Sequence, residues 1–454
     1  MSDLTGRALN RLAQQLGGRL LMPGDDRYAA ATAIWAKPAS RMPRAVAHCR
    51  TPKDVQAAIR AARDSGLSLS VRGGGHDWAG RALCDGLVID LSGMNTVAVD
   101  ASTRTARISG GARASDVLAV TDPLQLAAVA GSVGAVGFTG FTLGGGYGAL
   151  IGRFGLALDN LLAAEVVLAD VRVVVANHQN EEELFWALRG GGGNFGVVTT
   201  MDHHVHDLPS VRSGALFFPF AEAKSVFEGC AAIAASAPDE LSAQLGLISG
   251  PDGAPVVMAV PTWCGLPEEG EAQLAQFFQL GTLIASTVEV TPYGASLTAF
   301  DAFIVNGQRE FMETCWIPAL NTSSIEIFIE AMERAVSPGC AIFTHEFKGA
   351  ASRVPANETA FGLRRDHVLL EILATFQDRP DNDEEQRHQQ WARATLQAFD
   401  AMALPGGYPN LLAGGDPDRA AKSYGRNAER LIKAKRHYDP DNLFRSAIPL
   451  PVEQ

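Results

Sequence analysis

A histidine that follows three consecutive glycines is the first group in this sequence that could do chemistry. The stretch Val71–Gly80 reads VRGGGHDWAG and delivers His76 directly after the glycines. Glycine lacks a Cβ atom and adopts positive φ angles readily, so the amides of such a loop can approach a flat or anionic ligand closely. A second glycine-rich run, Gly131–Gly148, reads GSVGAVGFTGFTLGGGYG. We expect the two runs to close over one cofactor.

Two glutamates in strand-like segments are candidates for acid–base chemistry. Alternation in Ile342–Lys348 (IFTHEFK) places Thr344, Glu346 and Lys348 on one face and Phe343, His345 and Phe347 on the other. Glu371 lies in the nearly all-apolar segment Val368–Phe376. A buried carboxyl group has a raised pKa, as acid–base work requires. The alternative for each is a charge on the solvent side of a one-sided sheet or a structural Glu–Lys pair.

Histidines and cysteines do not suggest a metal site. His204 and His206 would share one strand face beside His203, but two imidazoles without a third ligand make a weak zinc site, so we predict exposed histidines. The cysteines show no CxxC spacing, which indicates buried free thiols: Cys49, Cys84, Cys230, Cys264, Cys315 and Cys340.

The elements that lead into the histidine loop have strong local signals. Thr51–Gly66 reads as a helix, with Thr51 as N-cap, Pro52 at the first helical position and Gly66 as terminator. A strand, Leu67–Arg72, follows directly. Further strands are predicted at Leu87–Leu91, Thr105–Ser109, Leu161–Leu168 and Arg172–Val175, and helices at Ser115–Thr121 and Asn180–Arg189. Asn180 with Glu183 forms a capping-box pattern at the start of the last of these.

Between Val205 and Leu404 the pattern changes to alternating strands and long helices. We interpret this region as a separate α+β domain whose sheet faces the cofactor. A last helix, Asp416–Tyr438, is expected to return to the first domain. The predicted division is residues 1–206 plus 405–454 for a cofactor domain and 207–404 for a substrate domain. The predicted strands are Ala215–Phe220, Gln244–Leu247, Val256–Ala259, Ile342–Phe347 and Val368–Phe376, and the helices are Ala221–Ala235, Ser323–Val336 and Asp383–Ala401.

Bulk composition excludes several classes of protein. A chain of 454 residues is too long for a single core. Its net charge of −12, without a basic stripe, argues against nucleic acid as a partner. We find neither a signal-peptide pattern nor an apolar run that could span a bilayer, so we expect a cytoplasmic protein without membrane association.

The glycine runs do not fit the common nucleotide-binding motifs. Gly191-x-Gly193-x-x-Gly196 matches a dinucleotide fingerprint, but a β-branched strand follows where a helix should open. Gly144-x-Gly146-x-x-Ala149 matches the alanine variant, but the segment after Ala149 is too short. No run ends in the Gly-Lys-Ser/Thr of a P-loop. A fold in which several loops surround an extended cofactor is the alternative.

Several ordered motifs together carry a family resemblance. They are RGGGH at Arg72–His76, the Gly131–Gly148 run, Gly155-Leu156 with Leu158-Asp159-Asn160, ELFWALRG at Glu183–Gly190, NFGVVT at Asn194–Thr199, and YDPDNLF at Tyr438–Phe444. With these motifs the chain resembles the berberine-bridge-enzyme-like branch of the vanillyl-alcohol-oxidase flavoproteins, nearest in pattern to its singly covalent, nicotine-oxidase-like members. The resemblance implies an α+β, two-domain PCMH-type FAD-binding fold, with an antiparallel-sheet substrate domain covered by helices.

The resemblance also implies which residues hold FAD. In the family the histidine of RGGGH is bonded to the flavin 8α-methyl group, so His76 is the implied covalent anchor. The other implied cofactor-binding residues are Arg72, Gly73, Gly74, Gly75, Asp77, Gly80, Gly131, Ser132, Val136, Gly137, Thr139, Gly140, Gly144, Gly146, Tyr147, Gly148, Asp159, Asn160, Val198, Tyr408, Asn410 and Asn442. Many relatives have a second, cysteinyl link. Here that position is Val133, so a single link is expected.

The catalytic end departs from the family pattern. Many members carry Tyr-x-Asn-Tyr, whose second tyrosine deprotonates the substrate, whereas Tyr408-Pro409-Asn410 is followed here by Leu411. The usual base is missing, and Glu346, Glu371, Lys348 and Asn410 are the replacement candidates. Val136 matches a position where valine accompanies oxidases, which favours O2 as electron acceptor. An already deprotonated amine would need less help from a base.

The resulting prediction is an FAD-dependent oxidase that moves a hydride from an alcohol or amine C–H bond of a small organic substrate and releases H2O2. The alternatives are a dehydrogenase with another acceptor, or a flavin-bearing binding protein without turnover. The sequence does not identify the substrate or the oligomeric state.

Overall fold

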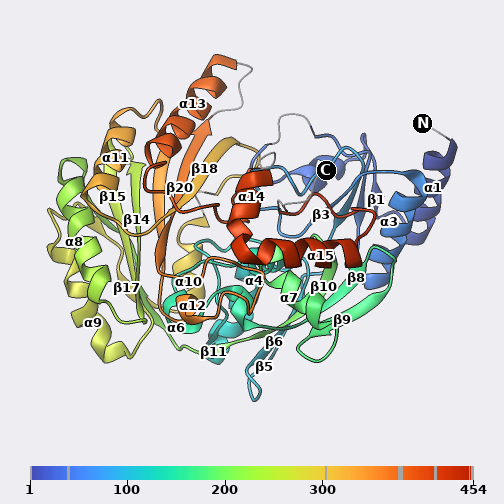
Figure 1. Cartoon of the computed structure of the whole chain (residues 1–454), viewed down its shortest axis with the longest axis horizontal. Helices are drawn as coiled ribbons and strands as arrows, with labels where there is room; N and C mark the ends of the chain where they lie inside the picture. Colours follow the sequence, from blue (N-terminus) through green and yellow to red (C-terminus); the bar gives the residue numbers. More distant parts are fainter. Residues whose placement is uncertain are drawn as a thin grey trace.

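The computed structural model describes residues 3–37, 41–301, 304–376, 382–413, 417–448 and 450. Three main sheets organise these residues (Figure 1). Two smaller sheets come from the first part of the chain and are called the N-terminal sheets below. The third, called the large sheet, comes from its middle part.

The first N-terminal sheet presents the histidine loop. Its strand order is β1-β2-β4-β3, and β2 and β3 each run parallel to β4. The bounds are β1 Leu20–Leu21, β2 Ala45–His48, β3 Leu69–Arg72 and β4 Leu87–Asp90. Helix α3, Pro52–Ser65, connects β2 to β3 and packs against α1, Asp3–Leu16. The predicted caps are confirmed, because Thr51 accepts from Asp54 N and Gly66 is left-handed at φ 62°.

The second N-terminal sheet is antiparallel, in the order β5-β6-β10-β8-β9. Its strands are β5 Val97–Asp100, β6 Thr105–Ser109, β8 Leu161–Leu168, β9 Val173–Asn177 and β10 Gly196–His204. Strands β7 Leu126–Ala127 and β11 His206–Asp207 pair beside it. The helical segments here are α2 Tyr28–Thr32, α4 Ala114–Thr121, η1 Asp122–Leu124, α5 Phe138–Gly144, α6 Ile151–Phe154, η2 Ala157–Asn160 and α7 Glu182–Gly191.

The predicted capping box at Asn180 is wrong. Helix α7 begins at Glu182, and its N-cap is Glu181 in the left-handed region without a side-chain cap bond. The Asn177 side chain instead accepts the backbone N–H groups of Gln179 and Asn180. This turn ends β9 and uses the backbone that the capping box would have needed.

The large sheet is antiparallel and carries helices on one face. Its main order is β16-β13-β15-β14-β19-β20-β18, and β12 and β17 pair at its side. The strands are β12 Val211–Ser213, β13 Leu216–Pro219, β14 Leu241–Ser249, β15 Pro255–Trp263, β16 Ala285–Ser286, β17 Glu289–Thr291, β18 Arg309–Ile317, β19 Cys340–Phe347 and β20 His367–Phe376. The helical segments are η3 Phe220–Glu222, α8 Ala223–Ser236, α9 Pro267–Ala275, η4 Phe277–Gln279, α10 Tyr293–Thr298, α11 Thr322–Glu333, α12 Ala350–Arg353 and α13 Asn382–Ala398.

The two faces of the large sheet belong to different hydrophobic cores. Helices α8, α11 and α13 pack on the outer face (Figure 1), where Leu370 and Ile372 of β20 join their apolar side chains. From the opposite face Phe347 and Leu369 enter the core of the N-terminal sheets. This second face, called the inner face below, is therefore the one turned toward the glycine loops.

The end of the chain returns to the N-terminal sheets, as predicted. Helix α14 spans Pro417–Tyr424, η6 spans Gly425–Asn427, and α15, Ala428–Tyr438, packs on α7 (Figure 1). The single predicted helix is therefore two, broken at Gly425, whose φ is 51°. Its predicted first residue, Asp416, lies outside the described residues.

The cysteine prediction is confirmed, since all six cysteines are buried free thiols. Within the described part of the chain, no helix combines the length and apolar character that a membrane crossing requires.

Candidate flavin site

The two glycine-rich runs meet backbone to backbone. A Cβ atom added to Gly74 would lie 2.4 Å from Gly137 Cα and 2.6 Å from Gly137 N. The second loop is held at this place by α4, because Ala114 N donates to Val136 O at 2.8 Å and Ser115 N donates to Gly134 O at 3.0 Å. The structure thus brings together Gly73, Gly74 and Gly75 with Val136 and Gly137, which sequence reasoning assigned to one cofactor.

His76 is held as a neutral imidazole at this junction. Its ring stacks on Trp35 with centroids 4.2 Å apart and planes 5° apart. The backbone of Trp35 is fixed in turn, because its main-chain N–H donates to Gly75 O at 2.9 Å. Burial lowers the pKa of His76 to about 4, although the negative charge of Glu371 opposes this shift. No described residue forms a hydrogen bond with the ring, so a nitrogen lone pair is free for a ligand.

A buried ion-pair network under the loop fixes its start. Arg72 Nη1 lies 3.0 Å from Asp90 Oδ1, and Arg72 Nη2 donates to Ala33 O at 3.1 Å. His48 Nδ1 lies 3.0 Å from the other oxygen of Asp90. Burial would raise the pKa of Asp90, but the His48 hydrogen bond and the Arg72 charge outweigh it and lower that pKa. The Arg72 side chain therefore points into the protein, toward Asp90 and Ala33, and holds the start of the histidine loop in place.

Replacing Asp90 by asparagine should destabilise the protein by about 3–5 kcal/mol at pH 7, because the buried Arg72 loses its counter-charge. A lowered pKa means that the carboxylate stabilises the fold above its unfolded pKa of about 3.9 and loses this effect as the pH falls. The difference in unfolding free energy between wild type and Asp90→Asn should thus shrink toward pH 3, as urea titrations would measure.

The matched control for this prediction is Asp202→Asn, which breaks a partly exposed pair with Arg107 at 3.2 Å. Asp202→Asn should lower the free energy of unfolding by at most about 1 kcal/mol. Equal losses in the two variants would show that the Asp90 network does not hold the loop.

The remaining predicted residues of the first loop also have roles within the protein. Asp77 accepts from Ala79 N at 3.1 Å and from Ala82 N at 2.7 Å, which closes the turn after the histidine. Gly80 has a φ of 69°, and its carbonyl accepts from Arg41 at 2.6 Å. These two residues shape the loop.

The second run contains close packing that only glycine allows. A Cβ atom at Gly144 would lie 2.0 Å from Asn410 Oδ1, one at Gly146 would lie 2.4 Å from Ala157 Cβ, and one at Gly148 would lie 1.9 Å from Ala130 O. A Cβ atom at Gly131 would lie 3.1 Å from the Phe141 ring, which is tight but less severe. Gly140 is different, because it is exposed and no atom lies within 4 Å of its missing side chain.

The residues present fit FAD. Thr139, at the start of α5 beside the Gly74–Gly137 contact, has a buried Oγ1 without a hydrogen-bond partner in the described residues, and Asn442 has a buried Oδ1 in the same condition. A buried polar atom without a partner is costly, so such atoms point to a missing ligand. Ser132, Val133 and Val136, in the same glycine-rich run as Thr139, are partly exposed. The Thr139 hydroxyl and the glycine backbone of the two runs offer donors and bare amides to an extended, phosphate-bearing cofactor.

Some predicted cofactor residues are engaged in the protein interior instead. Asp159 forms an ion pair with Arg364 at 2.7 Å, and Asn160 Nδ2 donates to Phe154 O at 3.0 Å and to Leu156 O at 2.9 Å. Val198 is buried in β10, where its carbonyl lies against Gly110. These residues hold the frame around the loops.

An aromatic cluster backs the second loop. Tyr408 Oη accepts from Gly146 N at 2.9 Å and from Asn410 Nδ2 at 2.9 Å. Burial raises the pKa of Tyr408 to about 12. Tyr147 Oη lies 2.7 Å from His367 Nε2. Because the other ring nitrogen of His367 faces Arg365 O at 2.7 Å and must donate, Tyr147 is the donor of this pair.

The large sheet separates the two candidate glutamates. Glu371 lies on the inner face, directly opposite Phe343 in the pairing of β19 with β20, and its carboxylate is 3.1 Å from His345 Nε2. Glu346 lies on the outer face with Cys230 of α8, where it accepts from Ala243 N at 3.2 Å and pairs with Lys348 at 3.6 Å. Burial raises the pKa of Glu346 despite Lys348. The structure therefore brings Glu371 to the loops, but not Glu346 or Lys348.

The histidine cluster differs from the prediction of exposed side chains. His203 is fully buried, and its two ring nitrogens face His204 O at 2.8 Å and Ala157 O at 3.0 Å. His206 stacks on Phe154 and contacts Asn160 Oδ1 at 2.7 Å. No group of three or more potential metal ligands occurs among the residues described here.

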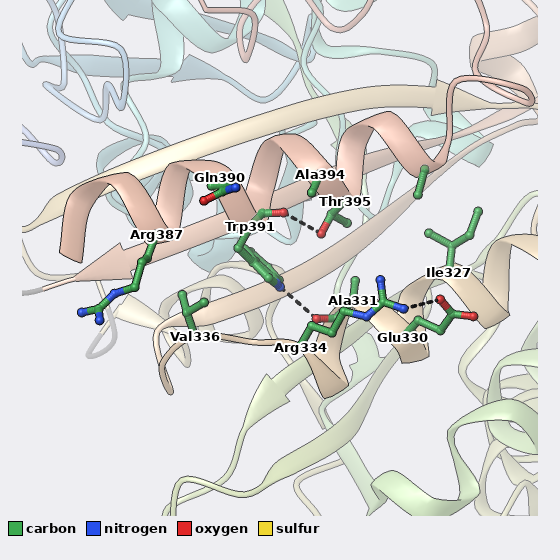
Figure 2. A pocket seen from close by; sticks show the side chains of 11 residues that line it. Ile327, Glu330, Ala331, Arg334, Val336, Arg387, Gln390, Trp391, Ala394 and Thr395 are labelled. Carbon is green, nitrogen blue, oxygen red and sulfur yellow. Dashed lines mark hydrogen bonds and ion pairs between the residues drawn. The ribbon is translucent and has the colours of Figure 1, made fainter. Parts of the chain in front are cut away.

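A hollow of about 270 Å³ lies elsewhere, between α11 and α13 on the outer side of the large sheet (Figure 2). Trp391 closes its floor and donates from Nε1 to Ala331 O at 2.8 Å, while Arg334 pairs with Glu330 at its rim (Figure 2). The helices and the sheet separate it from His76, so it is not part of the flavin site.

Sequence reasoning missed Trp35 and the partner of Glu371. Trp35 lies far from the RGGGH motif in sequence, and no local pattern connects the two. His345 was placed on the correct face by alternation, but its pairing with Glu371 depends on the register between β19 and β20.

Known protein families and proteins are similar to this chain over most of its length. The model of the FAD binding domain matches residues 43–177, and the berberine and berberine like model matches residues 381–451. (R)-6-hydroxynicotine oxidase of Paenarthrobacter nicotinovorans is 30% identical over 447 residues, covering 94% of this chain and 95% of the relative. A FAD-linked oxidoreductase of Dictyostelium discoideum is 27% identical over 449 residues, covering 96% and 95%.

Among solved structures, 6-hydroxy-D-nicotine oxidase from Arthrobacter nicotinovorans superposes with a TM-score of 0.84 at 27% identity, covering 94% of this chain and 96% of that one. The predicted fold class is thereby confirmed.

Proposed function

Because this chain belongs to the berberine-bridge-enzyme-like family of FAD-linked oxidoreductases, we propose that it is an oxidase of a small organic alcohol or amine that uses O2 and releases H2O2. The observation that carries this proposal is His76, a neutral imidazole presented where the two glycine loops meet. A relative that covers nearly the whole chain is itself named an oxidase.

FAD would be held by the backbone of Gly73–Gly75 and of Val136–Gly137, with the free Thr139 hydroxyl beside them. When bound, FAD supplies a two-electron acceptor for the hydride of the substrate. The stacked Trp35 keeps the His76 ring in one plane, and the Arg72–Asp90 pair keeps its loop in place.

A single covalent link through His76 is part of the proposal. Val133 occupies the position of the second link, and a valine side chain cannot form it. Cys84, the cysteine next to the histidine loop in sequence, is buried and directs its Sγ to the carbonyls of Ser68 and Leu87. At neutral pH the His76 ring is unprotonated, so a nitrogen lone pair is available for bond formation.

The inner face of the large sheet would form the substrate side of the site. Phe343, His345 and Glu371 lie there in one patch, and the charge of Glu371 acts on His76. We also propose that the chain divides near residues 206 and 404, which is supported by the core between the outer face of the large sheet and its helices, because all its buried residues lie between these positions. Val136 is small and partly exposed at the loop junction, which supports O2 as acceptor.

The test of this function begins with precipitation of the purified protein by acid. Yellow colour should remain with the pellet, and full release of the colour would overturn the covalent link. A panel of alcohols and amines should then produce H2O2 in proportion to the substrate consumed. Bleaching of the flavin by substrate without peroxide would indicate a dehydrogenase. A flavin that dithionite reduces and no donor bleaches would indicate a binding protein.

A further inference from the structure

His345 and Glu371 form a partly buried pair on the inner face of the large sheet. His345 Nε2 lies 3.1 Å from Glu371 Oε1, and the side chains are only 12% and 22% exposed. The pair spans two strands, since Phe343 of β19 lies directly opposite Glu371 of β20 and His345 is two residues further on. Two neighbouring strands therefore fix the relative position of imidazole and carboxylate.

The charge of Glu371 assigns the tautomer of the histidine. A carboxylate oxygen 3.1 Å from Nε2 favours a proton on this nitrogen, because a lone pair there would face the negative charge. The Gln244 amide lies 3.4 Å from Nε2 and must then direct its oxygen, not its NH2 group, to that proton, since two donors cannot bond each other. No described residue engages Nδ1, so its lone pair is free. This is the arrangement in which a carboxylate orients an imidazole as a proton acceptor.

The pair lies close to the covalent anchor. The charge of Glu371 acts on His76 and on Tyr408 across the interface between the large sheet and the glycine loops. Glu371 of β20 and Gln244 of β14 contact His345, and the charges that act on the nearby His76 are those of Glu371 and Arg113.

The other groups near the loops are unsuited to accept a proton. Leu411 has no titratable group at the position of the usual tyrosine. Tyr408 is buried, and its oxygen already accepts from Gly146 N and Asn410 Nδ2. Glu346 is on the outer face of the sheet. His345 remains as a candidate, because its Nδ1 is unprotonated and contacts no described residue.

We propose that Nδ1 of His345 accepts the hydroxyl proton of an alcohol substrate and that Glu371 is the positioning residue that holds the imidazole. In this step the substrate O–H bond breaks and its proton moves to Nδ1. The electron pair of that bond forms the carbonyl, and the C–H bond electrons leave with hydrogen as the hydride that the flavin of this family accepts. The inference rests on the proposed oxidase function and narrows its substrate class to alcohols, whose proton must be removed.

A first experiment reads the tautomer directly in the holoenzyme. With ¹⁵N-labelled histidine, the signal that disappears in His345→Gln should show a protonated Nε2 and an unprotonated Nδ1 in wild type. Glu371→Gln should shift this signal toward the other tautomer. A wild-type signal with a protonated Nδ1 would overturn the proposal, whatever the activity of the enzyme.

A second experiment measures anaerobic flavin reduction by the alcohol that gives the most peroxide in the panel above. General-base removal typically costs 10²–10⁴-fold, so His345→Gln should slow reduction by at least about 100-fold. Glu371→Gln should slow it less, with Glu371→Asp recovering part of the loss. The exposed His437→Gln is the matched control and should leave the rate unchanged.

The outcomes separate this inference from the proposed function. Reduction within about twofold of wild type in His345→Gln at every pH would overturn the role of His345 while leaving the oxidase intact. If amines but no alcohol bleach the flavin of the wild-type protein, the assignment of alcohols as substrates is overturned, while the oxidase function stands. If no donor bleaches the wild-type flavin, the proposed function itself fails. Retained covalent flavin in both variants shows that they are folded.

Discussion

His76→Ala should release the flavin into the supernatant on acid precipitation and lower the rate of substrate oxidation at least about tenfold, equivalent to about 1.4 kcal/mol in the barrier. The structure gives the reason. In the proposed site His76 is the neutral imidazole at the junction of the glycine loops, and valine, which cannot form a link, occupies position 133. An imidazole on the flavin ring withdraws electron density and favours its reduction, an effect that alanine cannot supply.

The measurements are the partition of absorbance near the flavin bands after acid treatment and the steady-state rate with added FAD. Cys84→Ala serves as the control, because its thiol is buried among the carbonyls of Ser68 and Leu87. It should leave the colour in the pellet. Colour that stays with the His76→Ala pellet would mean that another residue carries the link.

Gly74→Ala should abolish most flavin incorporation and cost about 1–3 kcal/mol of stability, the usual range for overpacking. The added methyl group would lie 2.4 Å from Gly137 Cα and 2.6 Å from Gly137 N. These are backbone atoms, which cannot rotate away as a side chain could. The two loops would have to separate. Since the proposed cofactor site is made by their junction, its geometry would be lost together with the contact.

The ratio of flavin to protein absorbance and the thermal midpoint measure these effects. Gly193→Ala is the matched control in another glycine run, because the nearest atom to its added methyl group is Ala447 Cβ at 3.8 Å. It should keep a full complement of flavin. A Gly74→Ala protein that purifies with a full complement would show that the loop contact is dispensable.

Local signals in the sequence predicted the frame of the molecule well. The caps of α3 are contained in the neighbouring residues Thr51, Pro52, Asp54 and Gly66, so they could be read directly. The strands β8, β10, β19 and β20 are apolar or alternate regularly, and their positions followed from that pattern. At Asn180 the same kind of reasoning failed, because Asn177 competes for the backbone with a turn of its own.

Features that depend on contacts between residues far apart in the sequence could not be predicted. Strand β18 carries three charged residues near its start, Arg309, Glu310 and Glu313, and was missed although it lies at the edge of the large sheet. The sequence offered Glu346 and Glu371 as equal candidates, and only the packing of α8 on one face of the sheet separates them. His203 was expected in solvent because no local pattern shows that the carbonyl of Ala157 lies over it.

Residues Tyr408–Leu411 make contacts with both glycine-rich loops, and these contacts can form only late in the synthesis of the chain. Leu411 O accepts from Trp78 of the histidine loop at 3.1 Å, and Asn410 Nδ2 donates to Phe141 O of the second loop at 3.1 Å. On the ribosome, both loops emerge long before these partners do. The nascent chain therefore lacks these two contacts until residues 408–411 have been made, so the proposed flavin site is completed only after both glycine-rich loops have left the ribosome.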